Sequence, residues 1–279
     1  MIDEELRKVQ LVQLEIALEI KRICEEHNIK YFLDSGTLLG AIRHKGFIPW
    51  DDDLDIGMER EEYNKFLKVI PESLGDKFEM QSWENDDHYG HPFIKIRKKN
   101  TKYVEMVCPH QKIQGIFVDV FPYDIFPEDK DQQRKQGRKI EILKRFLYTK
   151  SHYKNWVDSK NFKQKLTRRL IYVPFQILSV FISRKALFNT YDKIATQYNN
   201  TPSKYMFEQT GGTPYGKWVL PIECIRELAP VSFEGHEFLA SKDYDKYLKT
   251  IYKDYMQLPP EDKRYNRHGI IEIDFGEDE

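Results

Sequence analysis

Residues 34–57 read DSGTLLGAIRHKGFIPWDDDLDIG. The apolar run in front of them, residues 29–33, predicts a short strand that ends in a turn. Residues 38–44 then predict one or two helical turns. The acidic and apolar side chains that follow alternate with a period of two. Because successive side chains of a strand point to opposite faces, we expect Asp53 and Asp55 on one face of a second strand.

Four of the five residues from Asp51 to Asp55 are aspartates. Like charges this close repel each other and resist burial, so a cation must compensate them unless they lie in an exposed turn. A calcium loop of the EF-hand type needs glycine at its sixth position, where this sequence has Ile56. Two carboxylates on one strand face are typical of a site for a hard divalent cation that also binds phosphate oxygens. Asp53 and Asp55 are therefore candidate metal ligands, with Asp51 as a further one.

Gly36 and Thr37 form a candidate phosphate-binding turn, and Thr37 lies 16 residues before Asp53. Glycine lets the backbone approach a phosphate closely, while the hydroxyl and the first amides of a helix donate hydrogen bonds to it. A Gly-Thr pair alone is a weak signal. Joined to the downstream Asp-x-Asp, it predicts a site for a phosphate-containing substrate.

Outside this region the sequence alternates between helical and strand patterns. Val9, Val12, Ile16, Ile20 and Ile23 follow helical spacing and predict a long amphipathic helix over residues 4–28. Further expected strands are residues 77–83, 92–97, 103–108 and 116–121, and further expected helices are residues 59–70 and 129–149. The pattern predicts an α/β (α+β) fold.

We expect the chain to be organised in three parts. Residues 1–128 form a catalytic core with an N-terminal helix, residues 129–200 form a basic and then apolar helical segment, and residues 201–279 complete the same compact domain. Residues 130–169 carry a net charge of +11, and the rest of the chain carries −12. The acidic end, residues 272–279, is expected to be a solvated tail.

The composition narrows the classes of function. With 279 residues, 40% of them hydrophobic, the chain can bury a sizeable core. The formal net charge of −1 gives no overall attraction to nucleic acid. Three cysteines without CxxC spacing predict neither a disulfide framework nor a zinc finger and fit a reducing cytoplasm. Residues 1–6 lack the basic and apolar regions of a signal peptide, and no apolar run approaches the length of a membrane span, so a cytoplasmic protein is expected.

The run from Ser35 to Ile56 resembles the signature of the LicD family of phosphorylcholine transferases, within the nucleotidyltransferase superfamily, whose animal relatives include fukutin and the fukutin-related protein. Residues 95–97, 115–122 and 243–260 are similar to later motifs of the family, whereas residues 130–200 show no matching motif. The cysteine-rich zinc loop of the fukutin-related protein has no counterpart here. The resemblance implies a nucleotidyltransferase-like mixed sheet flanked by helices, with a mainly helical insertion or C-terminal half.

The resemblance also implies an activity. Proteins of this family transfer phosphocholine from CDP-choline to a sugar hydroxyl of a cell-surface glycan precursor, such as teichoic acid or lipopolysaccharide, and release CMP. By motif matching, Asp53, Asp55 and Asp119 would be the catalytic carboxylates and would hold Mg²⁺ or Mn²⁺. One of the three would accept the hydroxyl proton, with Asp119 as the first candidate, and the sequence does not decide which one. Asp119 lies within an apolar run, where an unpaired charge is costly, so a structural ion pair is the alternative interpretation.

Several other residues are candidates for substrate binding, in addition to Gly36 and Thr37. Arg43 and His44 lie near the acidic cluster, where they bind phosphate oxygens or simply balance charge. Lys95 and Arg97 alternate with apolar residues, so both should point to one face and flank the same diphosphate. A quaternary ammonium group is held by aromatic ring faces, and the candidates for such a cage are Trp50, Tyr89, Tyr123, Tyr215 and Trp218.

Two other interpretations stay open. The same fold can use another donor, such as CDP-ribitol or a nucleoside triphosphate, and the acidic loop can belong to a non-catalytic calcium-binding or glycan-binding module. Because the family's acceptors are lipid-linked glycans, the basic and then apolar segment 130–187 also suggests peripheral contact with the inner face of the cell membrane. The alternative is a basic solvated helix followed by an ordinary core helix.

Overall fold

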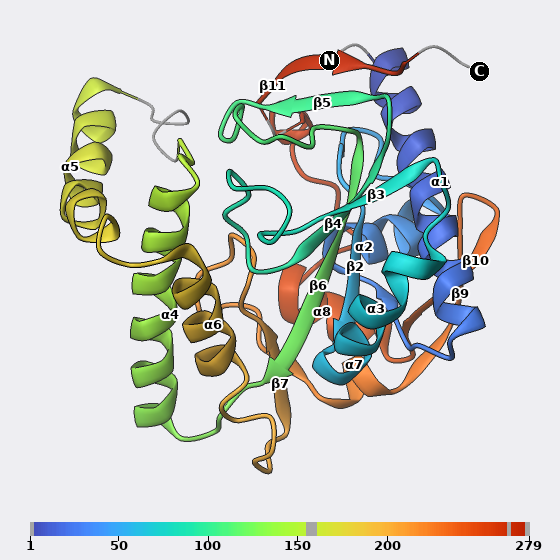
Figure 1. The fold of residues 1–279 in the computed structure, drawn as a ribbon. Coiled ribbons are helices and arrows are strands. Elements are labelled where there is room, and N and C mark those ends of the chain that lie inside the picture. Colours follow the sequence, from blue (N-terminus) through green and yellow to red (C-terminus); the bar gives the residue numbers. More distant parts are fainter. Residues whose placement is uncertain (1–2, 155–160, 267–268, 277–279) are drawn as a thin grey trace.

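The computed structural model describes residues 3–154, 161–266 and 269–276. A seven-stranded mixed sheet runs in the order β1-β2-β6-β4-β3, and β7 and β8 extend it from the far end of β6 (Figure 1). Its strands are β1 (Phe32–Leu33), β2 (Asp55–Glu59), β3 (Phe78–Gln81), β4 (Ile94–Lys98), β6 (Phe117–Ile125), β7 (Tyr205–Glu208) and β8 (Leu220–Pro221). The helices are α1 (Asp3–Glu26), α2 (Ser35–His44), α3 (Arg60–Ser73), α4 (Lys130–Lys150), α5 (Phe162–Ser179), α6 (Arg184–Ala195), α7 (Glu223–Arg226) and α8 (Tyr244–Tyr252), with a 3₁₀ turn at Glu261–Lys263. The mixed α/β class predicted from the sequence is confirmed.

The centre of the sheet is the parallel pair β2 and β6, in which Asp55 lies opposite Asp119. All other strand pairs in this sheet are antiparallel. Parallel strands need a long connection between them, and residues 60–116 supply it with α3, β3, β4 and β5 (Lys102–Glu105). The pairing brings together two aspartates that are far apart in the sequence.

The predicted N-terminal helix is confirmed as α1, whose apolar stripe enters the main core. Val9, Ile16, Ile20 and Ile23 are fully buried there. Two glutamines on the same helix donate to the acidic loop: Gln10 to the Asp51 carbonyl and Gln13 to the Asp52 carbonyl. Thus α1 both fills the core and holds the loop that precedes β2.

Two boundaries near this loop differ from the expectation. Helix α2 begins at Ser35, so Gly36 and Thr37 lie in its first turn and not in a turn before it. Strand β2 begins at Asp55, so Asp53 lies ahead of the strand. The reason is local: Asp34 is extended and accepts the Leu38 amide, which starts the helix early, while α1 binds the carbonyls of the loop.

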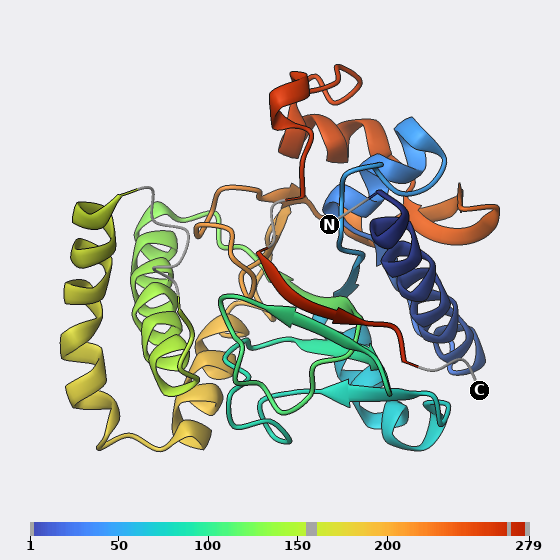
Figure 2. The same cartoon turned by 90° about the horizontal axis from the view of Figure 1, so that it is seen from above.

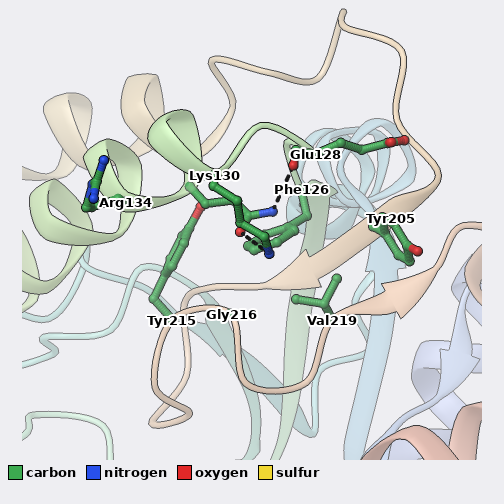
Figure 3. Close-up of a pocket in the computed structure, with 9 residues that line it drawn as sticks. Phe126, Glu128, Lys130, Arg134, Tyr205, Tyr215, Gly216 and Val219 are labelled. Carbon is green, nitrogen blue, oxygen red and sulfur yellow. Dashed lines mark hydrogen bonds between the residues drawn. The ribbon is translucent and has the colours of Figure 1, made fainter.

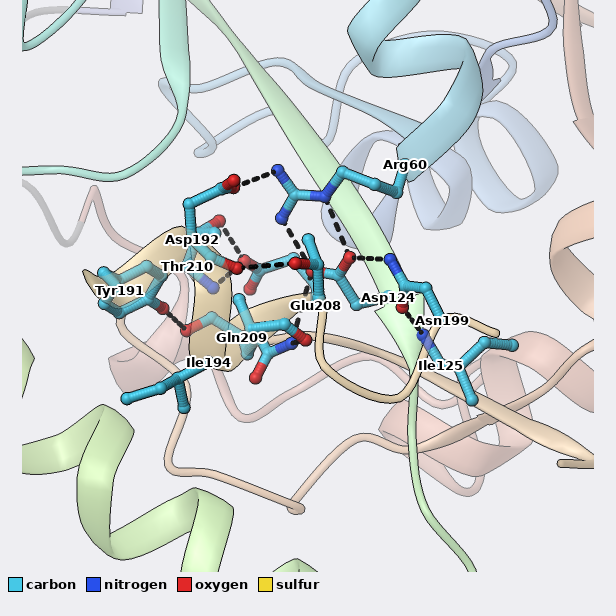
Figure 4. Close-up of polar contacts among 12 residues, drawn as sticks. Arg60, Asp124, Ile125, Tyr191, Asp192, Ile194, Asn199, Glu208, Gln209 and Thr210 are labelled. Atoms are coloured by element: carbon cyan, nitrogen blue, oxygen red, sulfur yellow. Dashed lines mark hydrogen bonds and ion pairs between the residues drawn. The ribbon is translucent and has the colours of Figure 1, made fainter. Parts of the chain in front are cut away.

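A buried polar network fixes β6 against the helices beside it (Figure 4). Arg60, the first residue of α3, makes two hydrogen bonds with the carboxylate of Asp124 on β6 and an ion pair with Asp192 on α6. Asn199 and Gln209 also donate to Asp124. A fully buried carboxylate needs such partners, and here they join α3, β6, α6 and the β7 region.

The described residues of the segment 129–200 form mainly the helices α4, α5 and α6, and the helix predicted over residues 129–149 is confirmed as α4. It contacts both α5 and α6, and α5 lies at the outer edge of the molecule in both views (Figures 1 and 2). Among the described helices, no single one is long and apolar enough to cross a membrane; α5 and α6 pass that test only together, and the chain bends by 111° between them.

The acidic C-terminal end is more ordered than expected. Residues Ile270–Asp274 form β11, which pairs antiparallel with β5, so the prediction of a solvated tail is wrong for residues 272–274. Ile270 and Ile273 pack against the main core, which explains why the strand docks. Residues 277–279 lie outside the described part. A separate hairpin, β9 (Leu228–Phe233) and β10 (His236–Ser241), packs beside β1 and α2.

Candidate active site

A cavity of about 290 Å³ opens where α2, the acidic loop and β2 meet. Five carboxylates line it: Asp34, Asp51, Asp53, Asp55 and Glu208. Aromatic and small residues from distant segments form the opposite wall, namely Phe121, Tyr123, Phe207, Gly211, Gly212, Thr213, Trp218 and Tyr252. The Asp-x-Asp pair predicted from the sequence therefore faces one cavity, although only Asp55 belongs to the strand.

Helix α2 holds β2 at this cavity. The Thr37 hydroxyl accepts the Asp55 amide at 2.8 Å, and the Asp34 amide donates to the Asp55 carbonyl at 3.0 Å. Thr37 is buried, so its hydroxyl positions Asp55; its expected role as a substrate-binding group is corrected. Gly36 borders the cavity, and a Cβ at this position would lie 3.0 Å from Oδ2 of Asp51. Glycine at this position lets the acidic loop approach α2 without displacing the Asp51 carboxylate.

Burial and neighbouring negative charge raise the pKa of the carboxylate at the centre of this cavity. The pKa of Asp55 lies well above its ordinary value because of burial first, and then because of the charges of Asp53, Asp119, Asp34 and Asp51. Burial also raises the pKa of Glu208 on the other wall. A cavity with this much negative charge favours a bound cation, or a proton on one of its carboxylates.

Asp119 lies beside Asp55 but has a partner of its own. The Lys95 ammonium is 3.0 Å from Oδ1 of Asp119 and 3.7 Å from Oε2 of Glu105. Burial raises the pKa of Asp119, and Lys95 opposes that shift. Lys95 is itself buried, so it pairs with Asp119 and is not placed to flank a diphosphate, which corrects that prediction. The structural ion pair that the sequence left open for Asp119 is present.

The donor chemistry at this site suits a hard cation, because carboxylate oxygens are the ligands that Mg²⁺ and Mn²⁺ prefer. As the described side chains stand, no three His, Cys, Asp or Glu groups converge closely enough to hold a metal ion. Asp51, Asp53 and Asp55 share the cavity wall and could close around one by side-chain rotation. Asp119 would first have to loosen its pairing with Lys95.

Two other predicted binding residues are not at the cavity. Arg97 is 1% exposed, and its guanidinium donates to Gln81, to the Gly115 carbonyl and to Gln111. Tyr89 is fully buried, with its ring against Phe93. For Arg97 the reason is that alternation along a strand gives the face of a side chain but not what covers that face. Tyr89 lies in the turn between β3 and β4, where its position near other motifs does not show that its ring is buried. Lys95 and Arg97 do share a face, since both lie over the Phe117 ring.

Arg43 and Trp50 line a neighbouring cavity of about 420 Å³, which shares Gly36, Asp51 and Tyr252 with the first. Arg43 also donates to the Tyr255 carbonyl at 2.8 Å and to the ring of His44 at 2.9 Å. Burial, together with the charge of Arg43, lowers the pKa of His44, so this imidazole is neutral at pH 7. Arg43 thus lines the second cavity and not the one that holds Asp53 and Asp55, and His44 is a hydrogen-bond partner of Arg43.

Comparison with known proteins agrees with this geometry. The family model described as LicD/FKTN/FKRP, nucleotidyltransferase domain, matches residues 28–185. The chain belongs to this family. The lipopolysaccharide cholinephosphotransferase LicD of Haemophilus influenzae is 33% identical over 275 residues, which cover 94% of this chain and 96% of that protein. The human ribitol 5-phosphate transferase FKRP is 42% identical over 137 residues, which cover 48% of this chain and 25% of the human protein.

This LicD-family protein also has site residues that sequence reasoning missed. Asp34 accepts hydrogen bonds from Tyr123 and Tyr247, and burial raises its pKa. Its position directly before Ser35 was the only sequence signal. Glu208 and Tyr252 reach the cavity from β7 and α8, and no spacing in the sequence connects them to Asp55. Of the predicted aromatic candidates, Tyr123 and Trp218 do line this cavity.

The LicD-family chain has a larger open cavity, about 640 Å³, away from the aspartates (Figure 3). Tyr215, another predicted cage candidate, lines this outer cavity together with Phe126, Lys130 and Arg134. One chain segment borders both cavities: its residues Gly212 and Trp218 line the cavity with the aspartates, and its residue Tyr215 lines the outer cavity. Because its wall lacks a cluster of carboxylates, the outer cavity is not the candidate active site.

Proposed function

We propose that this protein is a metal-dependent transferase that moves phosphocholine from CDP-choline to a sugar hydroxyl of a cell-surface glycan precursor and releases CMP. The observation that carries the proposal is the cavity in which the aspartates of the family motif face the aromatic rings of Trp218 and Tyr252. The whole-length similarity to a lipopolysaccharide cholinephosphotransferase supports it. That relative favours a lipopolysaccharide acceptor over teichoic acid.

The aromatic wall suits the choline end of the donor. The ring centroids of Trp218 and Tyr252 lie 6.3 Å apart, with planes inclined by 45°. A quaternary ammonium makes no hydrogen bonds and is held by such ring faces, with a contribution of up to about 2 kcal/mol when desolvated. Carboxylates such as Glu208 add attraction for the positive charge.

The carboxylate wall suits the diphosphate. Asp51, Asp53 and Asp55 would hold Mg²⁺ or Mn²⁺, which supplies neutralisation of the negative charge on the phosphate oxygens. Gly36 leaves room at the start of α2, where helix amides favour a phosphate, and Arg43 lies beside them. A carboxylate of this cluster accepts the proton of the attacking sugar hydroxyl. Asp119, the residue expected for that role, would have to exchange its contact with Lys95 for the hydroxyl.

A second candidate keeps the fold and changes the donor to CDP-ribitol. The similarity to human ribitol 5-phosphate transferase FKRP, 42% identity over 137 residues, favours it. A polyol needs hydrogen-bonding partners along its whole length, whereas choline needs ring faces. The aromatic pair at the cavity therefore makes CDP-choline the first choice.

Incubation with CDP-choline or CDP-ribitol, each with Mg²⁺ or Mn²⁺, and measurement of CMP by mass spectrometry test the proposal. We expect CMP from CDP-choline, loss of turnover in EDTA, and loss of turnover in the Asp53→Asn variant. Asp52→Asn is the matched control, because Asp52 is buried, accepts the Tyr103 hydroxyl and faces away from the cavity. Faster release from CDP-ribitol would favour the second candidate. If neither donor releases CMP in the presence of a glycan acceptor, the transferase proposal is contradicted and the non-catalytic binding module is favoured.

The choline subsite has its own test. Trp218→Leu should raise KM for CDP-choline more than KM for CDP-ribitol, by about tenfold, since it removes a ring face. Trp83→Leu is the control, because that ring stacks on Phe188 far from this cavity. Equal effects of Trp218→Leu on both donors would contradict a choline cage at this wall.

A further inference from the structure

Helix α5 carries an outward apolar stripe. Phe162, Leu166, Leu170, Val173 and Ile177 follow one another at spacings of 4, 4, 3 and 4, so they occupy roughly 80° of the helix circumference. All five are exposed, Phe162 by 79% and Ile177 by 61%. Val180 and Phe181, just beyond the helix, are exposed as well. A soluble surface rarely leaves so many large apolar side chains together in water.

The opposite side of α5 is the one that packs on the protein. The Phe175 ring lies 4.9 Å from the Phe146 ring of α4, and the Arg145 guanidinium lies over Phe175. Helix α4 separates α5 from α6 and from the sheet in both views (Figures 1 and 2). The stripe is therefore not a core face that happens to be uncovered; it points away from every described element that α5 contacts.

The charges beside the stripe are of one sign. From residue 159 to residue 191 the sequence contains no Asp or Glu. Lys163 and Lys165 are exposed in the first turns of α5 and flank the stripe on its two sides, and Arg169 follows on the side of Lys165. An apolar stripe bordered by cations is the pattern of a helix that lies in the plane of a bilayer surface.

We propose that α5 docks this protein on a membrane surface that contains anionic lipids, with the stripe inserted among the acyl chains and the flanking lysines at the headgroups. The charge pattern favours this occupant over a second copy of the chain, because two stripes in contact would oppose the same cations. The helix lies on the surface and does not span it: α6, which would have to continue the span, buries Leu187, Phe188 and Tyr191 against α4 after a bend of 111°. This docking does not depend on which donor the active site uses.

Flotation of the full chain with vesicles tests the apolar part of the proposal. We expect binding to mixed phosphatidylglycerol and phosphatidylcholine vesicles at low salt and weaker binding at high salt. The variant Leu170→Ser/Ile177→Ser should bind more than about tenfold more weakly. Leu11→Ser/Ile271→Ser is the matched control, since it removes one leucine and one isoleucine of similar exposure from other faces. Thermal melting checks that both variants stay folded.

The charge part has a separate test. Lys163→Gln/Lys165→Gln should weaken binding to anionic vesicles by about 30-fold at low salt, because each cation near such a surface contributes about 1 kcal/mol. Lys68→Gln/Lys99→Gln changes the net charge equally at exposed positions elsewhere and should bind like the wild type.

Three results would overturn the proposal: no binding at low salt, equal binding of the stripe variant and its control, or equal binding of the two charge variants. A wild-type dimer that becomes monomeric in the stripe variant, without vesicle binding, would assign the stripe to a second copy instead.

Discussion

The negative charges around Asp55 favour the binding of a cation at the cavity, but they lower the stability of the metal-free fold. The Asp55 carboxylate begins β2, faces the cavity and is surrounded by the charges of four other aspartates. Those charges raise its pKa, so the ionised form is costly in the fold. The same charges are what would draw a cation and a diphosphate into the cavity. Stability measurements on single residues can therefore separate the two effects.

Replacing Asp55 with asparagine should lower turnover by at least about a hundredfold while leaving the metal-free protein as stable as the wild type or more stable. The raised pKa means that the stability due to protonated Asp55 is fully present below about pH 4 and is lost as the pH rises through the folded-state pKa. We expect the variant's relative stability to increase with pH, measured by urea unfolding in EDTA. An advantage for the wild type that grows with pH would contradict the like-charge account.

Asp119 and Lys95 are best tested as a pair. Asp119→Ala leaves the buried Lys95 ammonium with Glu105 alone, so we expect a loss of roughly 3 kcal/mol of stability. The double change Asp119→Asn/Lys95→Met removes both charges and should recover most of it. Calorimetric titration of CDP-choline with Mg²⁺ on the double variant then reports on the site: retained metal-dependent binding would make Asp119 a structural residue only.

Gly36→Ala tests the close approach of the acidic loop. Alanine favours a helix by up to about 1 kcal/mol over glycine, so the urea midpoint should stay level or rise. Its Cβ would lie 3.0 Å from Asp51 Oδ2, so the carboxylate must move and KM for the donor should rise. Gly212→Ala is the control, since it lines the same cavity and its Cβ meets no atom within 4 Å. Similar kinetics for the two variants would count against this role of Gly36.

At the scale of elements, the site depends on two junctions. The first is the α2–β2 junction, where Thr37 and Asp34 hold the start of β2. The second is the network of Asp124, which anchors β6 to α3 and α6 (Figure 4). Strand β6 carries Asp119, the neighbour of Asp55, and the cavity residues Phe121 and Tyr123, so a shift of this strand would move all three.

Arg60→Met should destabilise the protein by about 3–5 kcal/mol, because it leaves the fully buried Asp124 without its main cation. Lys65→Met on the same helix is the control: its ion pair with Glu62 is exposed, so we expect a change within about 0.5 kcal/mol. Urea unfolding followed by fluorescence measures both. A loss of under 1 kcal/mol for Arg60→Met would show that other partners satisfy Asp124.

At the scale of the whole molecule, the C-terminal strand β11 supports the acidic loop of the site through β5. Strand β11 pairs with β5, Tyr103 on β5 donates to Asp52, and Asp52 belongs to the acidic loop. Residues near the C-terminal end of the described chain thus support the acidic loop, which lies in the N-terminal part of the sequence. The two views place β11 across β5, near the N-terminal end of α1 (Figures 1 and 2).

Ending the chain at residue 266 should lower the urea midpoint and raise KM for the donor, because β5 loses its partner strand and Tyr103 loses support. Removing residues 277–279 alone is the control and should change neither, since β11 stays intact. Full activity of the longer deletion would show that the acidic loop is held by α1 without help from β5.

The sequence by itself determined the family of this protein and most elements as far as α4, whereas no local pattern predicted the strands from β7 to β11. Helical spacing from Val9 to Ile23 and the alternation around Asp55 depend on neighbours a few residues apart, and such local patterns predict helices and strands directly. The Asp-x-Asp run with its upstream Gly-Thr also identified three of the five carboxylates that line the cavity, Asp51, Asp53 and Asp55. The start of β2 was misplaced because contacts with α1 and α2, which lie outside the local pattern, decide it.

Only the tertiary structure decided what surrounds those residues. The parallel pairing of β2 and β6 places Asp119 beside Asp55. The pairing of β4 with β6 brings Lys95 into an ion pair with Asp119, and Arg97 on the same strand is buried. The cavity wall with Tyr252, and the outward stripe of α5, also depend on which elements meet in space. These outcomes are sums of many weak contacts between residues far apart in sequence, and no spacing along the chain encodes such a sum.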